Sequence, residues 1–96
     1  MKSSEQKEPN WYVYIVRCSD NTLYTGIATD LERRVHEHNN SPKGSKYTRA
    51  RRPVELVYSE VMHNRSQASR RENLIKQLTN REKQLLIEKG LQPNET

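Results

Sequence analysis

Two short segments rich in β-branched and aromatic residues, 11–18 and 22–28, lie on either side of the polar cluster Ser19-Asp20-Asn21. β-branched and aromatic side chains favour strands, whereas serine, aspartate and asparagine favour turns. Two strands joined by a short turn pair as an antiparallel hairpin. This part of the chain therefore predicts a hairpin. Helices and strands that follow in the sequence are needed to bury its apolar side chains.

A helix and a third strand follow the hairpin. Thr29 and Glu32 have the three-residue spacing of a capping box, and they predict a helix that runs to residue 39 or 40. Residues 54–62 again have the composition of a strand. The basic residues between this helix and this strand are expected to form a loop that ends at Pro53.

Two more helices complete the predicted fold. Asn64 or Ser66 begins the first of them. Its inward face is expected to hold the apolar residues Ala68, Leu74, Ile75 and Leu78. Thr79 and Glu82 form a second capping box, and Gly90 is expected to end the short last helix. The order β-β-α-β-α-α predicts an α+β fold, in which helices cover a three-stranded, mostly antiparallel sheet.

The length of 96 residues corresponds to one domain. We expect this domain over residues 11–90, between a disordered polar tail of residues 1–10 and a polar tail of residues 91–96. No apolar run is long enough to span a bilayer, and the single Cys18 excludes an intramolecular disulfide and a structural zinc site. A cytoplasmic protein is the expectation.

The net charge of +5 comes from one segment, residues 41–53, which we call the basic segment. It contains no acidic residue and five basic ones: Lys43, Lys46, Arg49, Arg51 and Arg52. The other twelve basic residues (17 minus 5) are balanced by twelve acidic residues. A concentrated positive patch attracts a polyanion, and Tyr47 within it can stack on a base. We therefore expect nucleic-acid contact here; the alternative is a solvated loop.

Tyr14 and Tyr24 lie on the two strands of the predicted hairpin. They share a face only if the connecting loop has an odd number of residues or a strand has a bulge. Two converging phenols would flank the position of a phosphate oxygen or an attacking water. Gly26 would leave the same face bare, so that a sugar-phosphate backbone can approach. The alternative is a structural role, since the chain has five tyrosines and no phenylalanine.

Arg34 and His38 are four residues apart and share a face of the predicted first helix. Arginine stays charged, and its planar guanidinium can hold two phosphate oxygens while charge develops in a transition state. A histidine can hydrogen-bond a phosphate or transfer a proton near neutral pH. Together they indicate a catalytic site for a phosphodiester; the alternative for His38 is an ordinary surface histidine.

Glu72 lies at the edge of the apolar stripe of its helix, four residues after Ala68 and three before Ile75. This position directs its carboxylate partly inward. A single carboxylate can hold Mg²⁺, because this ion keeps most of its water ligands. Such an ion would neutralise a scissile phosphate and stabilise the leaving oxygen. The alternative is an ion pair with Lys76, one turn further along the helix.

In combination and order, these residues resemble the GIY-YIG nuclease superfamily, in particular its small stand-alone bacterial members, the YhbQ-like proteins. The resemblance covers residues 11–86. It rests on the segments 12–18, 23–26, 30–34, 46–48, 52–58 and 71–76. It implies a three-stranded antiparallel sheet with flanking helices, one site for Mg²⁺ or Mn²⁺, and the hydrolysis of a DNA phosphodiester by an activated water.

The same resemblance implies a role for each candidate residue. Tyr14 and Tyr24 match the signature tyrosines that line the site, and one of them, Tyr14 in preference to Tyr24, would help to take the proton from the water. Arg34 matches the arginine that stabilises the phosphate, and Glu72 matches the metal-binding glutamate. His38 occupies the helix position where relatives have a histidine or a tyrosine.

The chain also departs from the family pattern. Tyr12 stands in place of the first signature glycine, Thr25 stands in place of an isoleucine, and no asparagine clearly matches the one that follows the glutamate in larger members. Three alternatives stay open for target choice: it is poor, it follows the structure of the nucleic acid, for example damaged or branched DNA in repair, or a protein partner supplies it. Two alternatives stay open: a non-catalytic nucleic-acid-binding module and a scaffold that docks acidic proteins. The sequence does not decide between DNA and RNA, or the oligomeric state.

Overall fold

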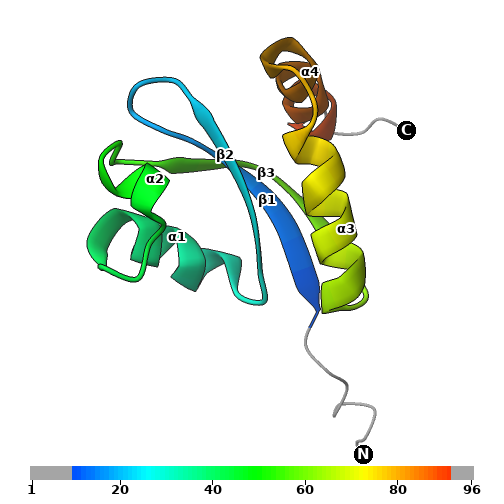
Figure 1. The fold of residues 1–96 in the computed structure, drawn as a ribbon, viewed down its shortest axis with the longest axis horizontal. Helices are drawn as coiled ribbons and strands as arrows, with labels where there is room; N and C mark the ends of the chain where they lie inside the picture. The colour runs from blue at the N-terminus through cyan, green and yellow to red at the C-terminus, as the bar shows by residue number, and fades with distance from the viewer. Residues whose placement is uncertain (1–9, 92–96) are drawn as a thin grey trace, which may run out of the picture.

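A three-stranded antiparallel sheet lies at the centre of the computed structural model, which describes residues 10–91 (Figure 1). Its strands are β1 (Trp11–Arg17), β2 (Leu23–Ala28) and β3 (Glu55–Met62), in the order β2-β1-β3. The predicted α+β fold is thus confirmed. Of the predicted tails, residues 1–9 and 92–96 lie outside the described residues, and the predicted domain boundaries stay a prediction.

The hairpin of β1 and β2 brings Tyr14 and Tyr24 to one face of the sheet. Five residues, 18–22, connect the strands, which is the odd loop length that this arrangement needs. In the strand register, Tyr14 lies opposite Gly26, and Val16 lies opposite Tyr24. Side chains two residues apart on a strand point to the same side, so both phenols and Gly26 share a face.

Helices cover both faces of the sheet (Figure 1). On one side lie α1 (Leu31–Asn40) and α2 (Lys46–Arg49), and on the other lie α3 (Arg65–Lys76) and α4 (Asn80–Leu91). The predicted order has no counterpart of α2, a single turn of helix inside the basic segment. Ser45 caps this turn, because its hydroxyl accepts a hydrogen bond from the backbone N–H of Thr48 at 3.1 Å.

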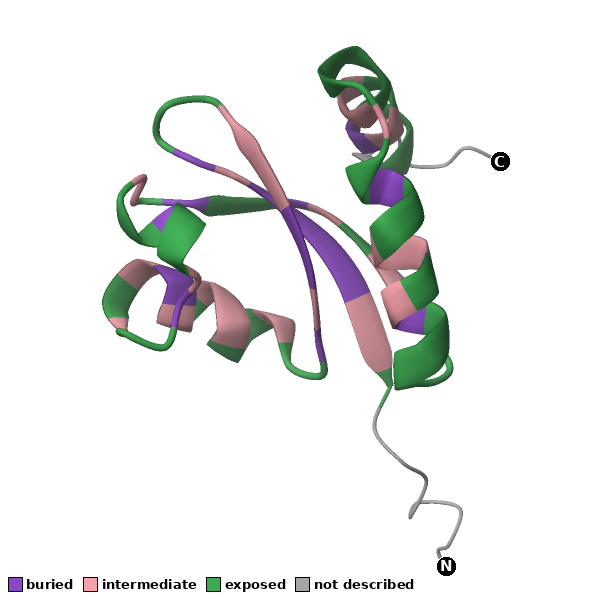
Figure 2. Ribbon diagram, in the orientation of Figure 1, coloured by how far each residue is buried: buried purple, intermediate pink, exposed green. Residues whose placement is uncertain are grey.

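The side chains of β1 alternate between two core clusters. Val13 and Ile15 pack with α3 and α4, whereas Tyr14 and Val16 pack on the side of α1. None of these four side chains is more than 1% exposed, and Figure 2 shows the burial along the central strand. A middle strand with helices on both faces has no side that contacts water. This explains why residues 11–18 lack the polar alternation of a half-buried strand.

Of the two predicted capping boxes, one is confirmed and the other is shifted. The backbone N–H of Thr79 donates to Glu82 Oε1 at 2.9 Å, and the backbone N–H of Glu82 donates to Thr79 Oγ1 at 3.1 Å. This is the capping box that the sequence predicts. At the start of α1, Asp30 replaces Thr29 as the cap: its carboxylate accepts from the backbone N–H of Arg33 at 3.1 Å.

Two predictions about α3 and α4 are wrong. Asn64 caps α3 as expected, and Ile75 is buried, but Leu74 is 54% exposed because it lies about 100° around the helix from Ile75. Gly90 does not end α4, which continues to Leu91. A Cβ at Gly90 would lie 2.5 Å from Cε1 of Tyr58. Gly90 therefore permits close packing of α4 on β3.

Gly26 also serves close packing rather than an open surface. A Cβ at this position would lie 2.6 Å from Oη and 2.8 Å from Cζ of Tyr14. The phenol ring of Tyr14 thus covers Gly26, and the expectation of a bare face for a sugar-phosphate backbone is wrong. The missing side chain provides the room that Tyr14 needs.

The longest described helices, α3 and α4, have 12 residues each. A helix that crosses a bilayer needs about 20 apolar residues. No helix within residues 10–91 meets this requirement. The cytoplasmic location stays a prediction.

We expect Gly26→Ala to lower the free energy of unfolding by about 1–3 kcal/mol, because the added methyl group has no room beside the ring of Tyr14. Urea unfolding followed by circular dichroism measures the change. In a Tyr14→Ala background the ring is gone, so the same substitution should cost much less. An equal cost in both backgrounds would contradict this explanation.

Candidate functional site

The hydroxyl group of Tyr14 is the centre of the candidate site. It lies between β1 and α1, and its Oη is 2.8 Å from Nε2 of His38. Tyr14 is 1% exposed and His38 is fully buried, so the alternative of a surface histidine is wrong. The rings of Tyr24 and His38 meet edge to face, with 5.5 Å between their centroids. The fold therefore brings these three predicted site residues together.

A second set of hydrogen bonds holds His38 from the side of α2. Its Nδ1 is 2.8 Å from Oγ1 of Thr48, and the backbone N–H of Ser45 donates to the same nitrogen at 3.5 Å. The ring tautomer sets the direction of these bonds. With its proton on Nε2, His38 donates to Tyr14 Oη; with its proton on Nδ1, it donates to Thr48 Oγ1, whose hydroxyl donates to the backbone oxygen of Ser45 at 3.2 Å. The role of Ser45 and Thr48 as partners of His38 is not predicted from the sequence, although their three-residue spacing is that of a helix cap.

His38 is neutral at physiological pH. Burial and the nearby positive charge of Arg34 lower the pKa of its imidazole from 6.5 to about 4. The ring is thus a hydrogen-bonding group rather than a cation. With the ring proton on Nε2, the neutral ring can stabilise a negative charge on the phenol oxygen of Tyr14.

Burial and neighbouring charged groups shift the pKa of the Tyr14 phenol. Burial raises the pKa of the phenol from 10.0 to about 12, the Arg34 guanidinium opposes this shift, and the charges of Tyr24 and Glu72 add to it. Such effects require proximity, because the interaction of two charges falls with distance. Arg34, Tyr24 and Glu72, from α1, β2 and α3, therefore all lie within electrostatic reach of one phenol.

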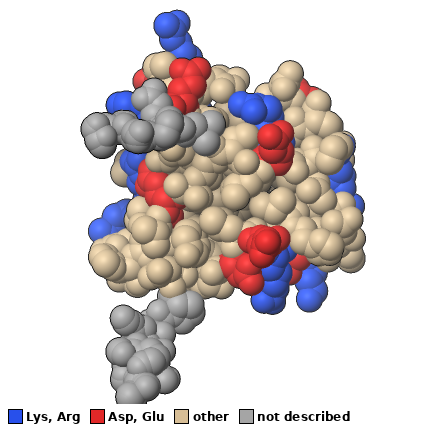
Figure 3. Space-filling model, turned by 180° about the vertical axis from the view of Figure 1, so that it is seen from behind, with Lys and Arg blue, Asp and Glu red and all other residues tan. Residues whose placement is uncertain are grey.

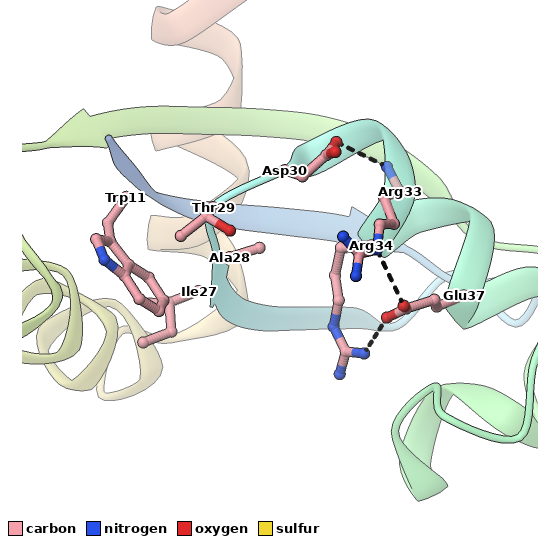
Figure 4. Close-up of a pocket in the computed structure, with 8 residues that line it drawn as sticks. All are labelled: Trp11, Ile27, Ala28, Thr29, Asp30, Arg33, Arg34 and Glu37. Carbon is pink, nitrogen blue, oxygen red and sulfur yellow. Dashed lines mark hydrogen bonds and ion pairs between the residues drawn. The ribbon is translucent and has the colours of Figure 1, made fainter. Parts of the chain in front are cut away.

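Two acceptors hold the guanidinium of Arg34. Its Nη1 donates to Glu37 Oε1 at 2.8 Å and to the backbone oxygen of Lys43 at 3.1 Å. The Arg34 side chain is 27% exposed, against 71% for the neighbouring Arg33. Arg34 lines a pocket of about 240 Å³ at the junction of β2 and α1, which Figure 4 shows. Its position suits an anion that enters this pocket.

Glu72 is half-buried on α3, with 18% of its side chain exposed. Its Oε2 is 3.1 Å from Nζ of Lys76, so the predicted alternative of an ion pair is present. Within residues 10–91, no three His, Cys, Asp or Glu side chains gather into a metal cage. A single carboxylate is a hard oxygen ligand that fits Mg²⁺ or Mn²⁺ when water and substrate complete the coordination. The donor set therefore fits such an ion without a protein cage.

The side chains of the basic segment differ in exposure. Three of them are exposed: Lys43, Lys46 and Arg49. Arg52 instead turns back to the end of α1, where its Nε donates to the backbone oxygen of His38 at 2.5 Å and its Nη2 donates to that of Ser41 at 2.6 Å. Carbonyl groups at a helix end need such partners. The prediction that Arg52 contacts nucleic acid is therefore corrected: Arg52 caps α1.

Tyr47 connects the basic segment to the site. Its ring stacks on Tyr24 with 5.9 Å between centroids, and the guanidinium of Arg51 lies 3.9 Å from the Tyr47 centroid. Arg51 also forms an ion pair with Asp20, with 3.0 Å between Nε and Oδ2. The stack gives Arg51 and Tyr47 fixed positions beside the site. Their contact with nucleic acid stays a prediction.

Several positive charges outside the basic segment are paired. Arg71 Nε is 2.8 Å from Glu60 Oε1, and Arg33 Nε is 3.6 Å from Glu37 Oε2. Figure 3, the view from behind, shows acidic and basic side chains next to one another on that face. The exposed cations of the basic segment are therefore a local excess of charge.

The chain is similar to known proteins over most of its length. Residues 10–85 match the family of GIY-YIG catalytic domains. A UPF0213 protein from Desulfotalea psychrophila is 56% identical over 89 residues, which are 90% of this chain and 81% of the relative. Another UPF0213 protein, from Haloquadratum walsbyi, is 55% identical over 84 residues, which are 88% of this chain and 93% of the relative.

Two solution NMR structures have a similar fold. The UPF0213 protein from Bacillus halodurans is 42% identical with a TM-score of 0.56, and the match covers 88% of each chain. A protein from E. faecalis is 34% identical with a TM-score of 0.58, and the match covers 94% of this chain and 96% of that one. The resemblance predicted from the sequence is thus confirmed.

We expect the fold to lose stability as the pH falls from 6.5 toward 4. In this range the unfolded chain binds a proton at His38, whereas the folded protein, with its lowered pKa of about 4, does not. The stabilisation is complete above pH 6.5, and its loss is on the order of 3 kcal/mol. Urea unfolding across this range measures it.

The matched control is His36→Gln, on the exposed surface of the same helix. This variant should keep the pH dependence of the wild-type protein, whereas His38→Gln should be less stable at pH 7 and have a flatter dependence. Parallel curves for the wild-type protein and His38→Gln would contradict the assignment.

Proposed function

Because the chain belongs to the family of GIY-YIG catalytic domains, and within it to the UPF0213 proteins, we propose that it is a divalent-metal-dependent endonuclease. Its substrate is the phosphodiester backbone of nucleic acid, in the first place DNA. The products form when a water molecule attacks phosphorus and the P–O bond to the leaving oxygen breaks.

The observation that carries this proposal is the convergence of four residues, from the three elements α1, β2 and α3, on the phenol of Tyr14. His38 of α1 contacts its oxygen, and Tyr24 of β2, Arg34 of α1 and Glu72 of α3 act on its charge. A base, a phosphate-binding cation and a metal-binding carboxylate are the groups that this hydrolysis needs. In this proposal Tyr14 is the base, Arg34 the cation and Glu72 the carboxylate.

Tyr14 takes the proton of the attacking water. Burial disfavours its phenolate, but the charge of Arg34 favours it, and His38 favours it when its ring proton lies on Nε2. His38 is a positioning residue, since it acts on the reaction through Tyr14. Tyr24 forms the wall of the site beside His38.

Arg34 binds the scissile phosphate and stabilises the charge that develops on it. Glu37 and the backbone oxygen of Lys43 hold one side of its guanidinium, so it needs little reorganisation when the substrate arrives. Glu72 would hold Mg²⁺ or Mn²⁺. When bound, such an ion supplies charge neutralisation at the phosphate and at the leaving oxygen.

The exposed Lys43, Lys46 and Arg49 contact the nucleic-acid backbone next to the site, with Tyr47 and Arg51 beside them. Contacts of this kind give affinity without sequence preference. A protein partner would then supply the choice of target, in DNA repair or another process.

We expect Arg34→Ala and Glu72→Gln each to lower the cleavage rate at least about 100-fold, because the first removes the phosphate-stabilising cation and the second removes the charge that holds the metal. The measurement is product formation from labelled single-stranded, duplex, flapped and branched DNA and from RNA, with Mg²⁺ or Mn²⁺ and with EDTA.

Arg81→Ala and Glu88→Gln, both on the exposed surface of α4, are the matched controls, and they should cleave at nearly the wild-type rate. Wild-type cleavage by a folded Arg34→Ala protein would contradict the role of Arg34. Salt-sensitive binding without any product, equal in Glu72→Gln and wild type, would instead identify a non-catalytic nucleic-acid-binding module.

We expect the cleavage rate to rise up to about tenfold per pH unit between roughly pH 7 and 9, because the phenolate fraction of Tyr14 rises at this rate below its pKa of about 12. Tyr14→Phe should cleave slowly and with a flat pH profile. Tyr12→Phe is the matched control on the same strand and should keep the slope.

The pH range over which cleavage rates can be compared has an upper limit, because the fold loses stability at high pH. Burial raises the pKa of both Tyr14 and Tyr58 to about 12, so the stability present below pH 10 is lost as the pH rises toward 12. Rates are therefore compared below pH 10. A wild-type slope in Tyr14→Phe would exclude Tyr14 as the base.

A further inference from the structure

We infer that Trp11 and the polar face of α3 form a second binding surface, which takes an unpaired strand of nucleic acid as it leaves the Arg34 pocket. We call this surface the α3 track; its residues are Trp11, Arg65, Ser66, Ser69, Arg70 and Asn73. The inference rests on the proposed function, because it extends the path of the same substrate. It assigns nucleic-acid contact to residues outside the basic segment.

The pocket of Arg34 extends as far as Trp11. Figure 4 shows Trp11 and Ile27 at one end, Glu37 at the other end, and Arg34 between them. Its volume of about 240 Å³ is below the roughly 300–1,000 Å³ of sites for drug-sized ligands, so it suits one phosphate with part of a nucleoside. A phosphate on Arg34 would have its neighbouring base near the indole ring of Trp11.

Trp11 connects this pocket to α3. The guanidinium of Arg65, at the start of α3, lies 5.7 Å from the centroid of the Trp11 ring, within the range of a cation–π contact. The indole is half-buried, because it packs against the core on the side of α3 and α4. A strand that passes Trp11 therefore meets Arg65 next.

Beyond Trp11, one face of α3 has only groups that bind phosphate or sugar. Arg65, Ser66, Ser69, Arg70 and Asn73 line a shallow hollow of about 590 Å³. They comprise two guanidiniums, two hydroxyls and one amide, and no carboxylate. These are the side chains that most often contact phosphate oxygens and sugars. The hollow is thus complementary to a polyanion in charge and in hydrogen-bonding groups.

The spacing of these residues gives the track its direction. Arg65, Ser69 and Asn73 are four residues apart and lie along one stripe of α3. Glu72 precedes Asn73 and lies at the buried edge of the same side of the helix. A strand along this stripe stays close to the proposed metal ligand. The track and the basic segment then bind the substrate on opposite sides of the site.

The aromatic ring favours an unpaired strand as the occupant. Stacking needs the face of a base, which the paired and stacked interior of a duplex does not present to a side chain at the end of a strand. Single-stranded or flapped nucleic acid presents such faces. Duplex nucleic acid can still bind through its phosphates, but without the contribution of Trp11.

The first test uses Trp11 as its own probe, because it is the only tryptophan of the chain. The full-length protein is titrated in EDTA, so that nothing is cleaved, with a short single-stranded DNA and with the blunt duplex of the same sequence. We expect the single strand to quench the Trp11 fluorescence and the duplex to change it little.

The second test measures affinity by the anisotropy of labelled single-stranded DNA. Trp11→Ala should weaken binding about 5- to 100-fold, and Arg65→Gln with Arg70→Gln should lower the salt dependence by about one unit of slope each. Arg81→Gln, an exposed arginine of α4, is the matched control and should change neither quantity. If Trp11→Ala does not fold, the two exposed α3 substitutions still decide the question.

The two hypotheses fail in different ways. If no nucleic acid binds or is cleaved, the proposed function is wrong and the α3 track has no substrate. If binding and metal-dependent cleavage occur, but the Trp11 fluorescence is unchanged and the α3 variants bind like Arg81→Gln, only the α3 track is overturned. Equal quenching by duplex and single strand would exclude the preference for an unpaired strand.

Discussion

The hydrogen bond between Tyr14 Oη and His38 Nε2 joins the sheet to α1, and much of the structure depends on it. Both groups are buried, so either one without its partner would be costly. The bond holds α1 at a defined distance from β1 and requires space for the phenol ring, which Gly26 provides. It also requires a partner for the second ring nitrogen of His38, which Thr48 provides from α2.

The contacts that hold this layer together also preorganise the site. Arg52 binds the backbone oxygen of His38 at the end of α1. Glu37 binds the guanidinium of Arg34, which lies one turn before His38 on the same helix. A site whose groups are held by packed helices loses little entropy when it binds a substrate. Part of the positive charge of the basic segment therefore stabilises the fold. The side chains of Lys43, Lys46 and Arg49 are exposed in the described structure, so their charges face solvent.

Much of the fold could be predicted because local patterns specify it. The hairpin follows from two β-rich runs around a turn, and the capping box of Thr79 and Glu82 forms as its spacing indicates. The four-residue spacing of Arg34 and His38 puts both on α1 and toward one site. Each of these features depends on residues within a turn of helix or a short loop, where chain geometry leaves few alternatives.

The sequence by itself determined which residue types were present, the helices and strands that carry them, and the family to which the chain belongs. Only the tertiary structure decided their partners. Gly26 was expected to be open and Gly90 to end a helix, yet both make room for tyrosine rings. Arg52 binds backbone oxygens instead of phosphate, and Trp11 meets Arg65 across 54 positions of the chain (65 minus 11). Such contacts depend on how whole layers pack, because periodicity specifies which face a side chain is on but not what lies against it.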